Sequence, residues 1–173
     1  LHCKWCYQGN IIKNTNTMDY QLAKKLIDLS SGLQAKNIIL IGGEPTLHPC
    51  FLDIVRYIES KNIKVGVVSN SIKFADKFFV QCAEDAGVKA VNTSIKGSSR
   101  EEYLASTGCD AFESLKTALA NLRNSKIVQQ ISVTVSSSII SNWNQMVELL
   151  KRSEVDNIIF SFEKPTLLPG RMN

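Results

Sequence analysis

A short apolar run leads into a Gly-Gly turn and a Glu-Pro pair in the stretch Asn37-Ile38-Ile39-Leu40-Ile41-Gly42-Gly43-Glu44-Pro45. A continuous run of branched apolar residues is typical of a strand buried on both faces of a parallel sheet. Glycines directly after such a strand leave the backbone bare, so a ligand can approach it closely. The same residues also suit a tight strand-to-helix turn with Glu44 near a helix N-terminus. This stretch alone leaves both interpretations open.

Outward from this stretch, helix and strand patterns alternate along the chain. The expected strands span residues 37–41, 63–69, 88–95, 131–135 and 157–162. The expected helices show apolar residues at helical spacing: Leu22, Leu26, Leu29 and Leu33 behind a Thr17 cap; Phe51, Ile54, Val55 and Ile58; residues 74–86, with Phe78, Phe79 and Cys82 on one face; residues 100–104; Phe112, Leu115, Leu119 and Leu122; and Trp143, Met146, Val147 and Leu150. Strands separated by helix-length crossovers must be parallel, so the pattern predicts an α/β domain.

Turn and polar residues follow the carboxyl end of each expected strand. They are Gly42 to Pro45, Ser69-Asn70, Ser94 to Lys96, Ser136 to Ser138 and Glu163 to Pro165. In a barrel, all strand ends form one ring around one site, whereas an open sheet gathers its ligands at a single switch point. Because the barrel accounts for all five groups, we predict a barrel of parallel strands.

A Cys-x-x-Cys pair, Cys3-Lys4-Trp5-Cys6, lies at the start of the sequence. Two thiolates at this spacing can hold one metal centre between them. A thioredoxin-like redox pair would be expected at a helix start in a different order of elements, and half a zinc site would need a second ligand pair that the sequence lacks. Neither of these two interpretations fits the sequence well, so the identity of the metal centre stays open at this point.

The cysteine pair and Gly42-Gly43-Glu44-Pro45 together resemble the radical S-adenosylmethionine (SAM) enzymes. That family carries Cys-x3-Cys-x-aromatic-Cys after its first strand and Gly-Gly-Glu-Pro after its second, and Cys3, Trp5 and Cys6 match the later part of the first motif. The resemblance implies a partial (β/α)6 TIM-like barrel whose first strand is missing from the sequence. It also implies that residues 1–173 are a fragment of the radical SAM core domain, and that a third cysteine lies four positions before Cys3.

The resemblance further implies a 4Fe–4S cluster with Cys3 and Cys6 as ligands, and SAM as the second cofactor. Trp5 would lie beside the adenine, the Gly42 and Gly43 carbonyls would meet the ammonium group, and Glu44, followed by Pro45, would help to orient it. Further SAM contacts are expected from Asn70, Ser94, Lys96, Ser136 and Leu168. Ordinary roles compete with several of these assignments, because Asn and Ser favour turns and lysine is mostly exposed. No catalytic residue is identified.

The amino-acid composition limits which classes of binding partner and which cellular compartment are expected. A net charge of +4 without a basic cluster gives no footprint for nucleic acid, and no apolar run is long enough to span a membrane. Five cysteines, an odd number, argue against a disulfide framework and favour the cytoplasm.

The family resemblance implies an electron donor such as flavodoxin or ferredoxin. Peptide or protein modification, glycyl radical activation and small-molecule chemistry all stay open. So do two alternatives: a degenerate radical SAM-like domain that binds peptides, and a non-radical α/β barrel enzyme.

Overall fold

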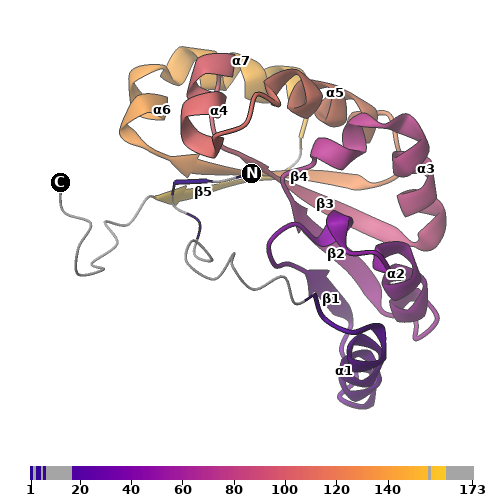
Figure 1. Ribbon diagram of the computed structural model, residues 1–173. Coiled ribbons are helices and arrows are strands. Elements are labelled where there is room, and N and C mark those ends of the chain that lie inside the picture. The colour runs from indigo at the N-terminus through magenta and orange to yellow at the C-terminus, as the bar shows by residue number, and fades with distance from the viewer. Residues whose placement is uncertain (2, 5, 7–16, 156, 163–173) are drawn as a thin grey trace, which may run out of the picture.

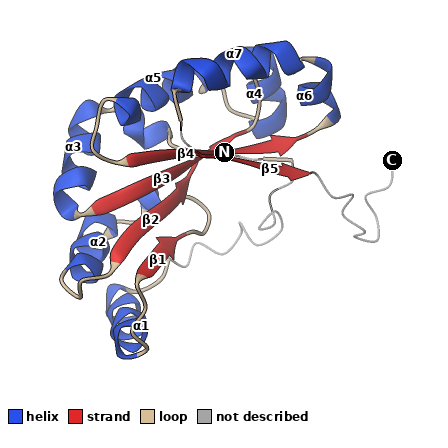
Figure 2. Ribbon diagram, turned by 180° about the vertical axis from the view of Figure 1, so that it is seen from behind, coloured by secondary structure: helices blue, strands red, loops and turns tan. Residues whose placement is uncertain are grey.

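The sheet has five parallel strands in the order β1-β2-β3-β4-β5, so each strand pairs with the next one along the chain. The computed structural model describes residues 1, 3–4, 6, 17–155 and 157–162. The sheet curls, and the helices lie along its convex side (Figures 1 and 2). A doubly wound sheet would reverse its strand order, whereas this order continues in one direction around a half-barrel. The predicted α/β partial barrel is confirmed.

The strands are β1 (Asn37–Leu40), β2 (Lys64–Ser69), β3 (Val88–Ile95), β4 (Val128–Val135) and β5 (Asn157–Phe162). The α-helices are α1 (Tyr20–Gly32), α2 (Phe51–Glu59), α3 (Lys77–Ala86), α4 (Arg100–Thr107), α5 (Phe112–Arg123), α6 (Ser137–Ser141) and α7 (Trp143–Ser153). Two 3-10 helices, η1 (Pro45–Leu47) and η2 (Ile72–Ala75), follow the carboxyl ends of β1 and β2.

Local sequence signals explain where several helices begin and end. The side chain of Asp19, rather than Thr17, accepts hydrogen bonds from the first backbone N–H groups of α1. Gly87 ends α3 at a φ of 111°, a left-handed conformation that favours glycine. Ser99 caps α4 by accepting a hydrogen bond from the backbone N–H of Glu102. These caps fix each helix relative to the strand beside it.

The core fills the space between the sheet and the helices. Alternate residues of the central strands, such as Val91, Ile95, Ile131 and Val133, are buried against that helical layer. The predicted apolar face of α2 is confirmed, because Phe51, Ile54, Val55 and Ile58 are all buried. Figure 2 shows the helices gathered on this one side, which leaves the concave face of the sheet for other contacts.

Three expectations about burial are wrong. Leu22, Leu26, Leu29 and Leu33 of the first helical region are exposed, and Ala23 and Ile27 are the buried residues of α1. Strand β1 is not buried on both faces, because its residues alternate between exposed and half-buried, and Ile39 and Ile41 are exposed. Phe78 is also exposed on α3. In α1 and α3 the face that packs is a neighbouring one, with Ala23 and Ile27 buried in α1 and Phe79 and Val80 buried in α3.

Candidate active site

The cysteine pair lies on a turn that is attached to helix α4. The backbone N–H of Cys6 donates to the carbonyl of Cys3 over 3.0 Å, which closes the turn and brings the two residues together. The backbone N–H of Lys4 donates to the carbonyl of Ser106, over 3.1 Å, near the C-terminal end of α4. Both cysteines are half-buried and neither forms a disulfide. This turn therefore presents two free thiols beside α4.

Lys96 lies at the carboxyl end of β3, close enough to both cysteines for their charges to interact. Burial lowers the pKa of Lys96, and negative charge on Cys3 and Cys6 opposes that shift. Burial likewise raises the pKa of the Cys3 thiol, and the ammonium of Lys96 opposes it. The Lys96 Nζ donates to Thr134 Oγ1 across 3.1 Å, from β3 to the neighbouring strand β4. A partly buried cation thus stands beside the thiol pair.

The Glu44 carboxylate ties the carboxyl end of β1 to that of β2. Its Oε1 accepts from the backbone N–H of Thr46, from the Thr46 hydroxyl and from the Ser69 hydroxyl at 3.2, 2.7 and 2.8 Å. Its Oε2 accepts from the backbone N–H of Asn70 at 2.7 Å. A carboxylate oxygen offers more than one lone pair, so Oε2 keeps acceptor capacity toward a bound cation. Glu44 is both the cap of η1 and a fixed negative charge.

The turn after β2 contains a residue in a left-handed conformation that several hydrogen bonds stabilise. Ser71 adopts a left-handed φ of 61°, which is unusual for a residue with a side chain. Its backbone N–H donates to Ser69 Oγ, and its hydroxyl lies 2.8 Å from that of Thr93. Asn70 Oδ1 accepts from the backbone N–H of Ile72. The Asn70 side chain therefore shapes this turn, and its role as a SAM contact stays a prediction.

The remaining predicted contacts occupy different places at the strand ends. Ser94 lies two residues before Lys96 and shares its side of β3, since both are half-buried between buried neighbours. Ser136 is buried and caps α6 by accepting from the backbone N–H of Ile139. A side chain at Gly42 would meet no atom within 4 Å, and neither Gly42 nor Gly43 is among the described glycines with positive φ. The turn therefore offers a ligand open space beside Gly42, and it does not depend on a left-handed backbone conformation.

Sequence reasoning missed a row of polar side chains along the concave side of β3 and β4. Ser132 Oγ donates to Asn92 Oδ1 over 2.6 Å, and the Lys96–Thr134 bond lies further along the same pair of strands. Alternation of polar and apolar residues in Gln130-Ile131-Ser132-Val133-Thr134 signals this arrangement. The concave face is thus polar where it approaches the cysteine turn.

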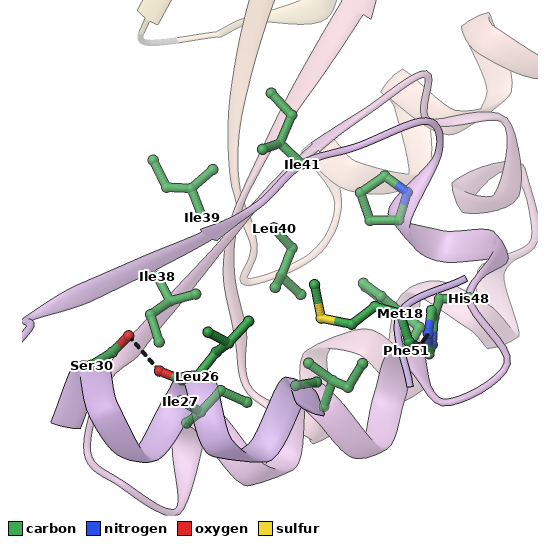
Figure 3. A pocket seen from close by; sticks show the side chains of 13 residues that line it. Met18, Leu26, Ile27, Ser30, Ile38, Ile39, Leu40, Ile41, His48 and Phe51 are labelled. Carbon is green, nitrogen blue, oxygen red and sulfur yellow. Dashed lines mark hydrogen bonds between the residues drawn. The ribbon is translucent and has the colours of Figure 1, made fainter. Parts of the chain in front are cut away.

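An apolar pocket of about 330 Å³ lies elsewhere, between α1, β1 and α2 (Figure 3). Met18 and Phe51 line it together with residues of β1. His48 Nδ1 accepts from the backbone N–H of Cys50, so its Nε2–H donates to the carbonyl of Met18 at 2.8 Å. His48 therefore links the segment before α1 to the turn before α2, which is a structural role.

Trp5 and Leu168 lie outside the described residues, as do Glu163 to Pro165. Within the described part of the chain, no three His, Cys, Asp or Glu side chains gather to hold a metal ion. Two thiols on one turn, with a cation beside them, fit the share of an iron–sulfur cluster that Cys3 and Cys6 would supply.

Comparison with known proteins identifies the family. The model of the "Radical SAM superfamily" matches residues 1–151. The GTP 3',8-cyclase of Chlorobaculum tepidum is 30% identical over 123 residues, which are 70% of this chain and 37% of that protein. The solved structure "Native anSMEcpe with bound AdoMet" is 18% identical at a TM-score of 0.77, covering 93% of this chain and 47% of the other. Streptococcus suis SuiB bound to precursor peptide SuiA is 12% identical at a TM-score of 0.79, covering 94% and 36%.

The chain belongs to the radical SAM superfamily, a family of enzymes whose cofactors are a 4Fe–4S cluster and SAM. It spans less than half the length of each of these three proteins. No helix among the described residues is long and apolar enough to cross a membrane.

Proposed function

We propose that this chain forms the core of a radical SAM enzyme in which Cys3 and Cys6 ligate the cluster and the neighbouring strand ends bind SAM. The observation that carries the proposal is the position of Lys96, partly buried at the carboxyl end of β3 and in electrostatic reach of both cysteines. A buried lysine is uncommon without a negatively charged partner. A thiolate-bound cluster and a carboxylate of SAM are such partners.

Charge complementarity supports one orientation for the amino-acid part of SAM. Lys96 suits the carboxylate, with Thr134 holding its ammonium in place. Glu44 suits the SAM ammonium, because its Oε2 accepts a single hydrogen bond among the described residues and its other bonds fix its orientation. Open space at Gly42 supports a close approach to the backbone of the Gly42-Gly43 turn. When bound, the cluster and SAM together supply a 5'-deoxyadenosyl radical that takes a hydrogen atom from a substrate.

We further propose a peptide or protein as the substrate, which the likeness to SuiB bound to its precursor peptide supports at the level of the fold. A one-electron donor such as flavodoxin or ferredoxin would reduce the cluster. The five cysteines are all free, which supports a reducing compartment such as the cytoplasm.

The direct test is anaerobic reconstitution of the full-length protein with iron and sulfide. We expect cluster absorbance, and conversion of SAM to methionine and 5'-deoxyadenosine when a reductant is added. A colourless protein that binds peptides without cleaving SAM would instead support the degenerate domain, and a colourless active enzyme would support the non-radical barrel.

Lys96→Met should lower SAM affinity about tenfold, because it removes the charge that contacts the carboxylate while keeping the apolar stem. Calorimetric titration of the reconstituted protein with SAM measures this. Lys89→Met is the matched control, since Lys89 lies near the opposite end of the same strand and pairs with Glu59 on the surface. Equal SAM affinities for the Lys96 and Lys89 variants would show that Lys96 does not contact SAM and has a structural role alone.

Gly43→Val should weaken SAM binding much more than it lowers cluster content or the melting temperature. Gly43 is exposed and its φ is not among the positive values, so a side chain there brings no strain from a left-handed backbone. The added methyl groups would occupy the path along which SAM reaches the backbone. Unchanged SAM affinity in the folded variant would show that the Gly-Gly segment is only a tight turn.

A further inference from the structure

Tyr103 carries a polar group that no described residue satisfies. Its side chain is fully buried on α4, and its hydroxyl has no hydrogen-bond partner in the part of the chain that the structure describes. The ring packs against Phe112 with centroids 6.0 Å apart, so the ring is held in one place. The great majority of buried side-chain polar groups in proteins have a hydrogen-bond partner. An unpaired one therefore indicates a partner that binds there.

The surroundings of Tyr103 indicate which partner that is. Tyr103 lies within electrostatic reach of Cys3, Cys109 and Glu44, so it is near both the cysteine turn and the Glu44 carboxylate. Ser106, almost one turn further along α4, holds the backbone of Lys4 next to Cys3. Of the neighbouring groups, Cys3 has the largest electrostatic effect on Tyr103.

The backbone of Tyr103 is also held in place by an unusually close contact with Gly97. A Cβ atom at Gly97 would come within 2.5 Å of the backbone nitrogen of Tyr103, so α4 sits directly on the turn after β3. The Glu102 carboxylate accepts from the backbone N–H and the hydroxyl of Ser98, and from Asn142 Nδ2. These contacts leave the α4 backbone little freedom to move the hydroxyl toward another acceptor.

We propose that the Tyr103 hydroxyl donates a hydrogen bond to a sulfur of the cluster that Cys3 and Cys6 hold. This inference rests on the proposed function. Burial and the negative groups nearby raise the pKa of Tyr103, so the hydroxyl keeps its proton and stays a donor. Hydrogen bonds to cluster sulfurs are among the features that set the reduction potential. The reduced cluster carries one more negative charge, so a donor stabilises it more than the oxidised form. Tyr103 is thus a positioning and tuning residue.

Tyr103→Phe removes only the oxygen atom and tests the proposal in the reconstituted full-length protein. We expect the equilibrium constant for one-electron reduction to fall about tenfold, which is a shift of about 59 mV to lower potential. Spectroelectrochemical titration of the cluster measures it. The melting temperature of the cluster-free protein should stay equal or rise, because the described structure shows no bond from this hydroxyl to lose.

Tyr57→Phe is the matched control. The Tyr57 hydroxyl donates to Asp28 on the surface over 2.8 Å, so its loss should leave the cluster potential unchanged. A Tyr103→Phe potential within error of wild type would overturn the inference, and so would a loss of SAM affinity without a shift in potential. A wild-type protein that forms no cluster would instead contradict the proposed function itself.

Discussion

Replacing Cys3 or Cys6 with alanine is expected to abolish cluster absorbance and SAM cleavage together in the reconstituted full-length protein. A cluster that leaves one iron for SAM needs its remaining irons ligated by thiolates, and loss of one thiolate leaves an iron under-coordinated. Among the described residues no further His, Cys, Asp or Glu side chain gathers with Cys3 and Cys6, so neither cysteine has a replacement close by. Iron content, visible absorbance and methionine release measure the effect.

Cys82→Ala provides the matched control for these two variants. Cys82 is also a free and half-buried thiol, but it lies on α3, away from the cysteine turn. We expect this variant to keep wild-type iron content and SAM cleavage. If either site variant also kept both signals, Cys3 and Cys6 would be ordinary loop residues.

Gly97→Ala is expected to lower the free energy of unfolding by about 3 kcal/mol, at the upper end of what overpacking costs. The added Cβ would lie 2.5 Å from the backbone nitrogen of Tyr103 and 2.8 Å from the backbone carbon of Glu102. Backbone atoms of a capped helix cannot rotate away as a flexible side chain can, so α4 as a whole must shift. Urea titration of the cluster-free, full-length protein measures the loss.

Gly32→Ala separates this contact from a general effect of replacing glycine. A Cβ at Gly32 would meet no atom within 4 Å, and the residue is the last of α1, where alanine is favoured over glycine. We expect its stability to equal or exceed that of wild type. Equal stability of the Gly97 and Gly32 variants would mean that α4 moves aside without cost.

The sequence predicts where the strand-end residues lie, whereas their contacts with SAM stay predictions. Parallel strands bring their carboxyl ends to one edge, so Glu44, Asn70 and Lys96 had to lie on the same rim once the alternation of helix and strand was recognised. The strand predicted over residues 157–162 has those bounds in the structure. Periodicity was sufficient here because each prediction depended on the order of elements alone.

Reasoning from the order of elements cannot predict which face of α1 is buried, or that the Tyr103 hydroxyl lacks a partner among the described residues. The leucine spacing at Leu22, Leu26 and Leu29 indicates an apolar face, but it does not say which side of the helix meets the sheet. Tyr103 resembles any aromatic residue of a helix in the sequence. Its unpaired hydroxyl becomes evident only when groups far apart along the chain, Cys3 and Glu44, are brought near it.

The sequential strand order has a consequence for how the chain acquires its structure during synthesis. Each strand pairs with the one made just before it, so no strand has to be inserted later between two that have already paired. The segment between two paired strands contains one or two α-helices, and the entropic cost of closing a loop rises only slowly with its length. The described half-barrel can therefore grow from β1 toward β5 as the chain leaves the ribosome, adding at each step one strand and the helix or helices before it.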